Sequence, residues 1–176
     1  HNIKLAVQNN ILGTENILNV FKNKKIQIII ISTDKAVRPS SILGFTKRIS
    51  EIVAQKFSAD KKNISIIKIV RFGNVFGSQG SAVELFIEQM NSNLPITITN
   101  AKAKRFFMSL REACSLVIKV TSLTRKGKIY ILEMGKQIYI IDIVHKLADL
   151  KQIPQNKIKF KFIGLKKGEK LSEELS

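Results

Sequence analysis

An acid, an amine and a hydroxyl adjoin one another in the segment Thr33-Asp34-Lys35. They stand at the end of the run Ile26–Thr33, whose β-branched residues are typical of a strand buried on both faces of a parallel sheet. Open α/β sheets bind ligands at the carboxyl ends of such strands. Lys47 lies one turn after Leu43 in the next predicted helix and can face the same crevice. These side chains could perform acid–base catalysis, but a surface ion pair beside an ordinary helix lysine fits the spacing equally well.

The elements that would position these residues alternate along the chain. Segments with helical periodicity lie at residues 3–22, 43–57, 81–90, 109–123 and 139–150, and apolar runs of strand length at 26–33, 64–72, 94–99, 128–133 and 158–163. Ser109-Leu110-Arg111-Glu112 is a capping box that opens one of the helices. Strands that alternate with helices predict an α/β fold with a mainly parallel sheet.

The segment Gly73–Gly80 follows a predicted strand and precedes a helix, so it could be taken for a dinucleotide-binding turn. Its glycines are spaced G-x-x-x-G-x-x-G instead of G-x-G-x-x-G, and no second strand ending in an acidic residue follows about 20 residues later. We therefore interpret it as a turn at the carboxyl edge of the sheet. The chain opens with a helix, whereas a doubly wound sheet normally opens with a strand and its phosphate-binding turn.

Composition excludes several classes of protein. Hydrophobic residues make up 44% of the 176 residues, and no apolar run reaches the roughly 18 residues that a membrane helix needs. We expect a cytoplasmic protein without membrane contact. Cys114, the single cysteine, lies in an apolar run and is expected to be a buried, inert thiol. His1 and His145 are too few for a metal site, so no metal is expected.

The net charge of +17 has two interpretations. A basic surface is the electrostatic footprint of a nucleic-acid-binding protein. The lysines are, however, scattered along the sequence with few aromatic residues among them. Compositional bias, with lysines spread over solvated faces, is therefore the favoured interpretation, and no nucleic-acid partner is expected.

Five blocks in order carry a resemblance that covers nearly the whole chain. They are Ser32-Thr33-Asp34-Lys35-Ala36, Gly44-Phe45-Thr46-Lys47-Arg48, the segment from Arg71-Phe72-Gly73-Asn74 through Gln79 to Ser81, Arg105-Phe106-Phe107-Met108, and Gly164-Leu165-Lys166-Lys167-Gly168-Glu169-Lys170-Leu171. Together they resemble the polysaccharide-biosynthesis branch of the extended short-chain dehydrogenase/reductase family. That branch includes UDP-N-acetylglucosamine 4,6-dehydratases and capsular-polysaccharide proteins related to UDP-glucose 4-epimerase.

The resemblance implies a chemistry for the first cluster. Such enzymes oxidise a UDP-hexose at C4 with bound NAD or NADP, which makes the C5 proton acidic so that water can be lost. By similarity Lys35 is the C5 base, Asp34 is the acid for the departing C6 hydroxyl, and Thr33 lies near the C4 hydroxyl. Lys47 matches the lysine of the family's Tyr-x-x-x-Lys motif, which holds the nicotinamide ribose. By the same similarity Asn10 is an active-site asparagine, and Phe72 lies near the nicotinamide.

The resemblance also implies a substrate site. Its residues by similarity are Asn74, Thr97, Thr99, Arg105, Lys166 and Glu169, of which Asn74 and Arg105 would hold the diphosphate. Arginine suits that role because its planar fork binds two oxygens at once. An ordinary surface arginine is the alternative for Arg105.

Three departures from the family's pattern accompany these matches. Leu43 replaces the tyrosine of Tyr-x-x-x-Lys, Lys166-Lys167 replace an Arg-Pro pair, and the family's first strands with their glycine-rich turn are missing from these 176 residues. We therefore expect no tight cofactor binding by this chain alone. A homo-oligomer is a possible assembly of a full-length form.

The expected fold is a partial Rossmann-type parallel sheet with a small C-terminal substrate lobe. Residues 1–93 would form the C-terminal part of the dinucleotide-binding domain, and 94–176 the substrate-binding lobe, with sheet elements interleaved. The expected function is 4,6-dehydration of UDP-N-acetylglucosamine. The alternatives are 4-epimerisation of a UDP-sugar, an inactive truncated remnant, and a basic binding module.

Overall fold

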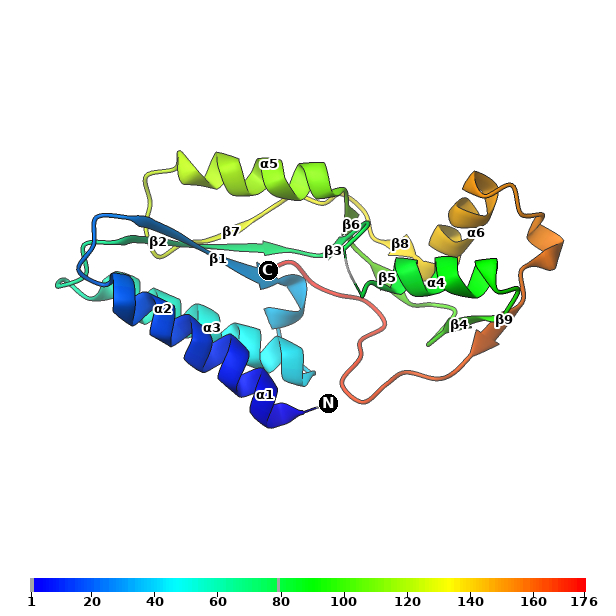
Figure 1. The fold of residues 1–176 in the computed structure, drawn as a ribbon, viewed down its shortest axis with the longest axis horizontal. Coiled ribbons are helices and arrows are strands. Elements are labelled where there is room, and N and C mark those ends of the chain that lie inside the picture. Colours follow the sequence, from blue (N-terminus) through cyan, green and yellow to red (C-terminus); the bar gives the residue numbers. More distant parts are fainter. Residues whose placement is uncertain (1, 79) are drawn as a thin grey trace. The chain divides into compact units, whose positions relative to one another are not determined.

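The computed structural model describes residues 2–78 and 80–176, so His1 and Gln79, which the sequence analysis names, lie outside the described residues. The chain forms two compact units (Figure 1). The first unit consists of residues 1–73, 113–133 and 174–176, and the second of residues 74–112 and 134–173. The chain therefore passes from one unit to the other several times.

The first unit is built on a parallel sheet of three strands in the order β1-β2-β7. These are β1 (Gln27–Thr33), β2 (Ile66–Phe72) and β7 (Ile129–Ile131). In the register of β1 and β2, Gln27 pairs with Ile66 and Thr33 with Phe72. The two strands therefore end together, and the residues that follow them share the carboxyl edge of the sheet.

Helices cover both faces of this sheet (Figure 1). One face carries α1 (Ile3–Val7), a π-helical turn (Gln8–Leu12), α2 (Gly13–Phe21) and α3 (Ile42–Ala59), and the other carries α5 (Leu110–Thr121). Side chains alternate along β2, so that Ile67 and Ile69 pack with α2 and α3 while Val70 packs with α5. The Rossmann-type α/β architecture with a parallel sheet is thus confirmed.

A buried lysine joins α5 to the sheet. Lys68, on the α5 side of β2, is fully buried, and its Nζ donates to the carbonyls of Val120 and Thr121 at 2.8 and 2.9 Å. These are carbonyls of the last helical turn, which lack partners within the helix. The negative end of the helix dipole also favours a cation there.

The second unit combines two helices with short strands. The helices are α4 (Ala82–Asn91) and α6 (Ile140–Leu150), together with a 3-10 turn at Gln155–Lys157. Two strand pairs are parallel, β3 (Asn74–Val75) with β6 (Phe107–Met108) and β4 (Ile96–Ile98) with β9 (Phe160–Phe162); the pair β5 (Lys104–Arg105) and β8 (Ile138–Tyr139) is antiparallel. Its core includes Phe86, Met90, Ile96, Ile98 and Val144.

Two predictions about local structure concern helix α5. The capping box is confirmed, since Ser109 N donates to Glu112 Oε2 at 2.7 Å and Glu112 N to Ser109 Oγ at 3.2 Å. The expected burial of Cys114 is wrong, because α5 turns Leu116 and Val120 inward and leaves the thiol exposed. No helix in the described ranges combines the length and the hydrophobicity needed to span a bilayer.

Candidate active site

The residues Thr33, Asp34 and Lys35 form a compact polar cluster where β1 ends. Thr33 caps a single 3-10 turn, Asp34–Ala36, that follows the strand. The Thr33 hydroxyl donates to Asp34 Oδ1 at 2.9 Å, and the Lys35 ammonium donates to the same oxygen at 2.9 Å. The strand thus delivers all three side chains to one point at the carboxyl edge of the sheet.

The Asp34 carboxyl group distinguishes this cluster from a surface ion pair. Its side chain is fully buried, whereas that of Lys35 is 26% exposed. The second oxygen, Oδ2, is buried and has no hydrogen-bond partner in the described part of the chain. Buried polar atoms are almost always paired, so the unpartnered oxygen sets Asp34 apart as a candidate functional group.

Helix α3 approaches this cluster closely because its first turn contains Gly44. A Cβ atom built on Gly44 would lie 2.3 Å from the carbonyl oxygen of Lys35 and 3.1 Å from Pro39 Cβ. A side chain at this position would therefore push the helix away from the 3-10 turn. Ser41 begins the helix by accepting a hydrogen bond from Gly44 N at 3.1 Å.

Lys47 lies on α3 next to the same strand. Its Nζ donates to the carbonyl oxygen of Ile31 on β1 at 2.7 Å. Burial lowers the pKa of Lys47, and the charge of Glu51 opposes this shift in part. In the described part of the chain this is the one hydrogen bond of the ammonium group, so two of its three N–H donors are available to a ligand.

Asn10 is joined to α3 by its side chain. Its Nδ2 donates to Thr46 Oγ1 at 2.9 Å, and its carbonyl oxygen accepts from Thr14 Oγ1 and Ser50 Oγ. Asn10 lies in the π-helical turn between α1 and α2, where the sequence predicted an uninterrupted α-helix. Such turns are frequent at functional sites because they reorient side chains and carbonyls.

The remaining predicted residues of the first unit differ in their surroundings. Phe72 is the register partner of Thr33 and packs with the core on the α5 side of the sheet. Leu43, at the position of the family's tyrosine, is 49% exposed on the first turn of α3. Its apolar side chain can neither donate nor accept a proton.

A buried ionic network, which the sequence analysis missed, joins β1, β2 and α3. Glu51 on α3 accepts from Ser32 Oγ at 2.6 Å, from Arg71 Nε and Nη2 at 2.7 and 2.6 Å, and from Arg48 Nη1 at 2.9 Å. Burial alone would raise the pKa of Glu51, but the hydrogen bonds from Arg71, Ser32 and Arg48, with the charge of Arg71, outweigh burial and lower it. Ser32 precedes Thr33, so the network fixes the strand directly before the polar cluster. An arginine at the end of the mostly apolar strand expected at 64–72 was the available sequence signal.

The second unit brings three of the predicted substrate residues, Thr99, Arg105 and Lys166, into hydrogen bonds with a fourth, Glu169. Its Oε1 accepts from Thr99 Oγ1 at 2.8 Å and from Arg105 Nη2 at 3.0 Å, and its Oε2 accepts from Lys166 N at 3.2 Å. The Arg105 side chain is 8% exposed. It also donates to the carbonyls of Lys104 and Leu171. The alternative of an ordinary surface arginine is therefore wrong.

The other two predicted residues of this unit lie outside that network. Thr97, on β4, pairs with Gln89 on α4, whose Nε2 donates to Thr97 Oγ1 at 2.9 Å. Asn74, on β3, pairs in register with Phe107 on β6.

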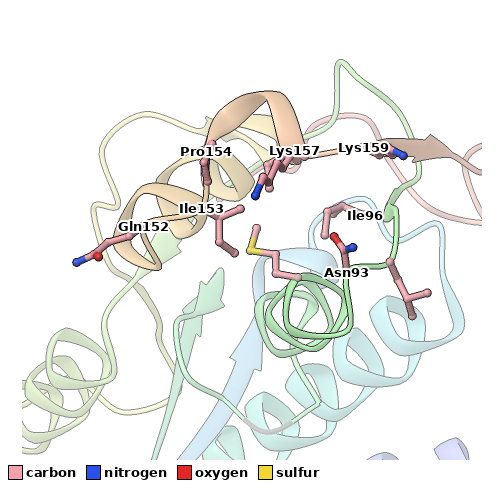
Figure 2. Close-up of a pocket in the computed structure, with 10 residues that line it drawn as sticks. Asn93, Ile96, Gln152, Ile153, Pro154, Lys157 and Lys159 are labelled. Carbon is pink, nitrogen blue, oxygen red and sulfur yellow. The ribbon is translucent and has the colours of Figure 1, made fainter.

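The second unit also has a cavity of about 280 Å³, between Met90, Ile96, Ile153 and Lys157 (Figure 2). None of the six predicted substrate residues lines this cavity. Residues 2–78 and 80–176 contain no His, Cys, Asp and Glu cluster suited to a metal ion.

Comparison with known proteins gives one family and several relatives. A family model described as "Polysaccharide biosynthesis protein" matches residues 1–176. The chain is 42% identical over 171 residues to the capsular polysaccharide biosynthesis protein CapD of Staphylococcus aureus, covering 97% of this chain and 28% of CapD. It is 36% identical over 172 residues to a UDP-glucose 4-epimerase of Rickettsia canadensis, covering 97% of this chain and 49% of the epimerase. The chain thus spans about half or less of the length of these relatives.

A solved structure agrees with the fold. The structure of UDP-glucuronic acid 4-epimerase from Bacillus cereus in complex with UDP-glucuronic acid and NAD superimposes with a TM-score of 0.84. It is 22% identical in sequence and covers 94% of this chain and 58% of the epimerase. At this identity the likeness establishes the Rossmann-type architecture alone.

Proposed function

Because this chain belongs to the polysaccharide biosynthesis protein family, we propose that it is the part of a nucleotide-sugar 4,6-dehydratase that supplies the acid–base residues and grips the sugar nucleotide. The observation that carries the proposal is the Asp34–Lys35 pair, in which a buried acid with one unpartnered oxygen adjoins an amine. Loss of water from a hexose needs a base that removes a proton from one carbon and an acid that protonates the hydroxyl on the neighbouring carbon. This pair supplies both groups.

In the proposed reaction Lys35 accepts the proton from C5 of the sugar, and Asp34 donates a proton to the C6 oxygen. The C6–O bond then breaks, water leaves, and a double bond forms between C5 and C6. The 2.9 Å hydrogen bond between Lys35 Nζ and Asp34 Oδ1 lets one proton pass between the two groups. Thr33, which donates to Asp34, would lie against the C4 hydroxyl.

The residues of the first unit fit a nicotinamide cofactor. When bound, NAD or NADP would supply the oxidation at C4 that acidifies the C5 proton, and the return of that hydride to C6 once water has left. Lys35 would then give the proton back to C5, which completes the 4-keto-6-deoxy sugar. Lys47 has two N–H donors available for the ribose hydroxyls, and Asn10 and Phe72 would lie beside it. The hydrogen bond from Asn10 to Thr46 holds the first helical segment against α3 on the side that carries Lys47.

The second unit would hold the UDP-hexose substrate, which we propose is UDP-N-acetylglucosamine. Arg105 and Asn74 would bind the diphosphate, and Lys166 would add a point charge. Glu169 holds the Arg105 guanidinium and the Thr99 hydroxyl together. A preordered arginine loses less conformational freedom on binding, which favours affinity. Thr97 lies on the side of β4 opposite the core residues Ile96 and Ile98.

A 4-epimerase is the second candidate, and the relative named UDP-glucose 4-epimerase supports it. Epimerisation returns hydride to C4 and needs no acid at C6, so it leaves Asp34 without a task. The deciding experiment incubates the complete gene product with UDP-N-acetylglucosamine and UDP-glucose and identifies products by NMR. A 4-keto-6-deoxy sugar supports dehydration, a C4 epimer supports the second candidate, and no turnover of either substrate supports an inactive protein.

Asp34→Asn is the diagnostic variant, with Asp60→Asn as the matched surface control. If the protein is a dehydratase, Asp34→Asn should lose roughly 10²–10⁴-fold in dehydration. An epimerase should tolerate the change much better, because its reaction does not use this acid.

A further inference from the structure

Basic residues that are scattered in the sequence meet at one edge of the sheet in the first unit. Because β1, β2 and β7 are parallel, the loops that precede them all lie at the amino edge. Figure 1 shows these loops at the left end of the sheet. The eight cations they carry are Lys22, Lys24, Lys25, Lys61, Lys62, Arg125, Lys126 and Lys128, which we call the basic edge.

Backbone hydrogen bonds join two of these loops to each other and the third to strand β2. Ile64 N, before β2, donates to the carbonyl of Lys22, before β1, at 3.2 Å. Gly127 N, before β7, donates to the carbonyl of Ile67 at 2.7 Å. Gly127 has a φ of +70°, and a Cβ atom there would lie 2.9 Å from Ser58 Oγ. The basic edge is therefore a defined surface of the fold.

Almost no negative charge offsets these cations. Asp60 is the single acidic residue in the three loops, and its Oδ2 lies 2.7 Å from Lys22 Nζ. The hydrogen bond from Lys22, with that from the Lys62 backbone, lowers the pKa of Asp60. Asp60 thus stays ionised at neutral pH and offsets one cation. The seven basic residues other than Lys22 are all exposed.

Two aliphatic side chains indicate which polyanion the basic edge fits. Ile64 is 56% exposed and Leu123 is 39% exposed, and both belong to these loops. The loops contain no aromatic residue on which a base could stack and no helix or ribbon that could enter a groove. Cations mixed with exposed aliphatic residues are typical of surfaces that bind anionic lipid headgroups and insert shallowly between them.

We propose that the basic edge docks on an anionic lipid bilayer. This contact would turn the opposite, carboxyl edge of the sheet, with Thr33, Asp34 and Lys35, away from the lipid and toward the solution. The proposal is independent of the reaction assigned above, because it uses none of the same residues. Lipid binding, instead of the compositional bias favoured from the sequence, would then explain these eight positive charges.

Vesicle sedimentation of the 176-residue chain tests the proposal. The vesicles are phosphatidylcholine, alone or with one third phosphatidylglycerol, at about 50 and about 200 mM salt. The test variant changes Lys24, Lys25, Lys61, Lys62 and Lys126 to Gln. The control variant changes five exposed lysines of the second unit, Lys102, Lys136, Lys146, Lys157 and Lys159, to Gln, so both variants lose the same charge.

We expect the wild type to bind the anionic vesicles, more weakly at high salt, and not to bind the neutral vesicles. Each lysine near an anionic surface contributes roughly fivefold in affinity, so the test variant should lose roughly a hundredfold or more and the control variant much less. Circular dichroism of both variants shows whether the fold is kept. Equal losses in the two variants would overturn the proposal in favour of net charge alone.

A second variant separates lipid from nucleic acid. Ile64→Ser with Leu123→Ser keeps every charge and should weaken vesicle binding by more than about fivefold. Its binding to a double-stranded DNA of arbitrary sequence should be unchanged. Unchanged vesicle binding in this variant, or tighter wild-type binding to the DNA than to the vesicles at equal salt, would contradict the lipid assignment.

Discussion

At the scale of single residues, the acid–base cluster depends on how closely α3 approaches the 3-10 turn at Gly44. Gly44→Ala should destabilise the protein by about 1–3 kcal/mol, because the new methyl group would overlap the Lys35 carbonyl, which belongs to backbone and cannot rotate away. Urea unfolding followed by circular dichroism measures the change.

Gly13→Ala is the matched control for this prediction. A Cβ atom there meets nothing closer than the Gln8 carbonyl at 3.5 Å, and Gly13 has helical dihedral angles. Alanine should therefore stabilise the protein by about 0.5–1 kcal/mol through its higher helix propensity. Equal effects of the two substitutions would show that close packing at Gly44 is unimportant.

Leu43 leads to a second prediction at this scale. In the complete gene product, Leu43→Tyr should change the rate of turnover by less than about tenfold, because chemistry at C4 must already proceed without a tyrosine. A properly positioned base contributes roughly 10²–10⁴-fold, so a gain of that size would identify Leu43 as a lesion. Steady-state rates with UDP-N-acetylglucosamine decide between the two results.

Some single residues could be predicted from the sequence and others could not. Thr33, Asp34 and Lys35 follow a strand whose composition marks both its nature and its end, so their convergence was expected. Cys114 was misassigned because an apolar run within a helix includes positions on both faces. The unpartnered oxygen of Asp34 depends on packing from α3, which no local pattern encodes.

At the scale of elements, the Glu51 network is a buried ionic connection between α3 and the strands β1 and β2. Glu51→Gln should cost about 3 kcal/mol at neutral pH, because it leaves the buried Arg71 without a counter-ion. Glu88→Gln, on an exposed position of α4, should change the free energy of unfolding by no more than about 0.5 kcal/mol.

The lowered pKa of Glu51 gives this prediction a pH dependence. A carboxyl group whose pKa is lower in the folded state stabilises the fold above its ordinary pKa of 4.5, and this contribution is lost as pH falls through the folded value. The difference between wild type and Glu51→Gln should therefore shrink below pH 4.5. A difference that stays constant down to the acid transition would mean that Glu51 does not titrate as described.

Long elements were predictable because their periodicity extends over many residues. The strands at 27–33 and 66–72 and the helix at 42–59 lie within a few residues of their expected positions. The pairs β3 with β6 and β5 with β8 contain two residues per strand, too few for any alternation to be detected. The π-helical turn at Asn10 likewise has no compositional signature, since its residues also suit an α-helix.

At the scale of the whole molecule, the spatial gathering of the basic residues was the least predictable feature. Eight cations in three short loops look like scattered composition until the parallel topology aligns the starts of three strands. The division into two units was similarly hidden, because contacts between segments distant in sequence decide it. Fold class needed only the alternation of strands and helices.

Cofactor affinity provides a prediction at this scale. The 176-residue chain alone should show no saturable binding of NAD at micromolar concentrations by calorimetry, because it contains no G-x-G-x-x-G turn between a strand and a helix to hold the pyrophosphate. Micromolar binding to the short chain would show that its own residues form a sufficient nucleotide site.

The most direct test of the proposed chemistry is Lys35→Met in the complete gene product, with Lys119→Met on the exposed side of α5 as control. The reaction with UDP-N-acetylglucosamine is run in D₂O, where NMR reports deuterium at C5 and absorbance reports reduced cofactor. We predict that Lys35→Met lowers dehydration and C5 deuteration by roughly 10²–10⁴-fold while reduced cofactor still forms. Undiminished deuteration at C5 in Lys35→Met would contradict the assignment of Lys35 as the base.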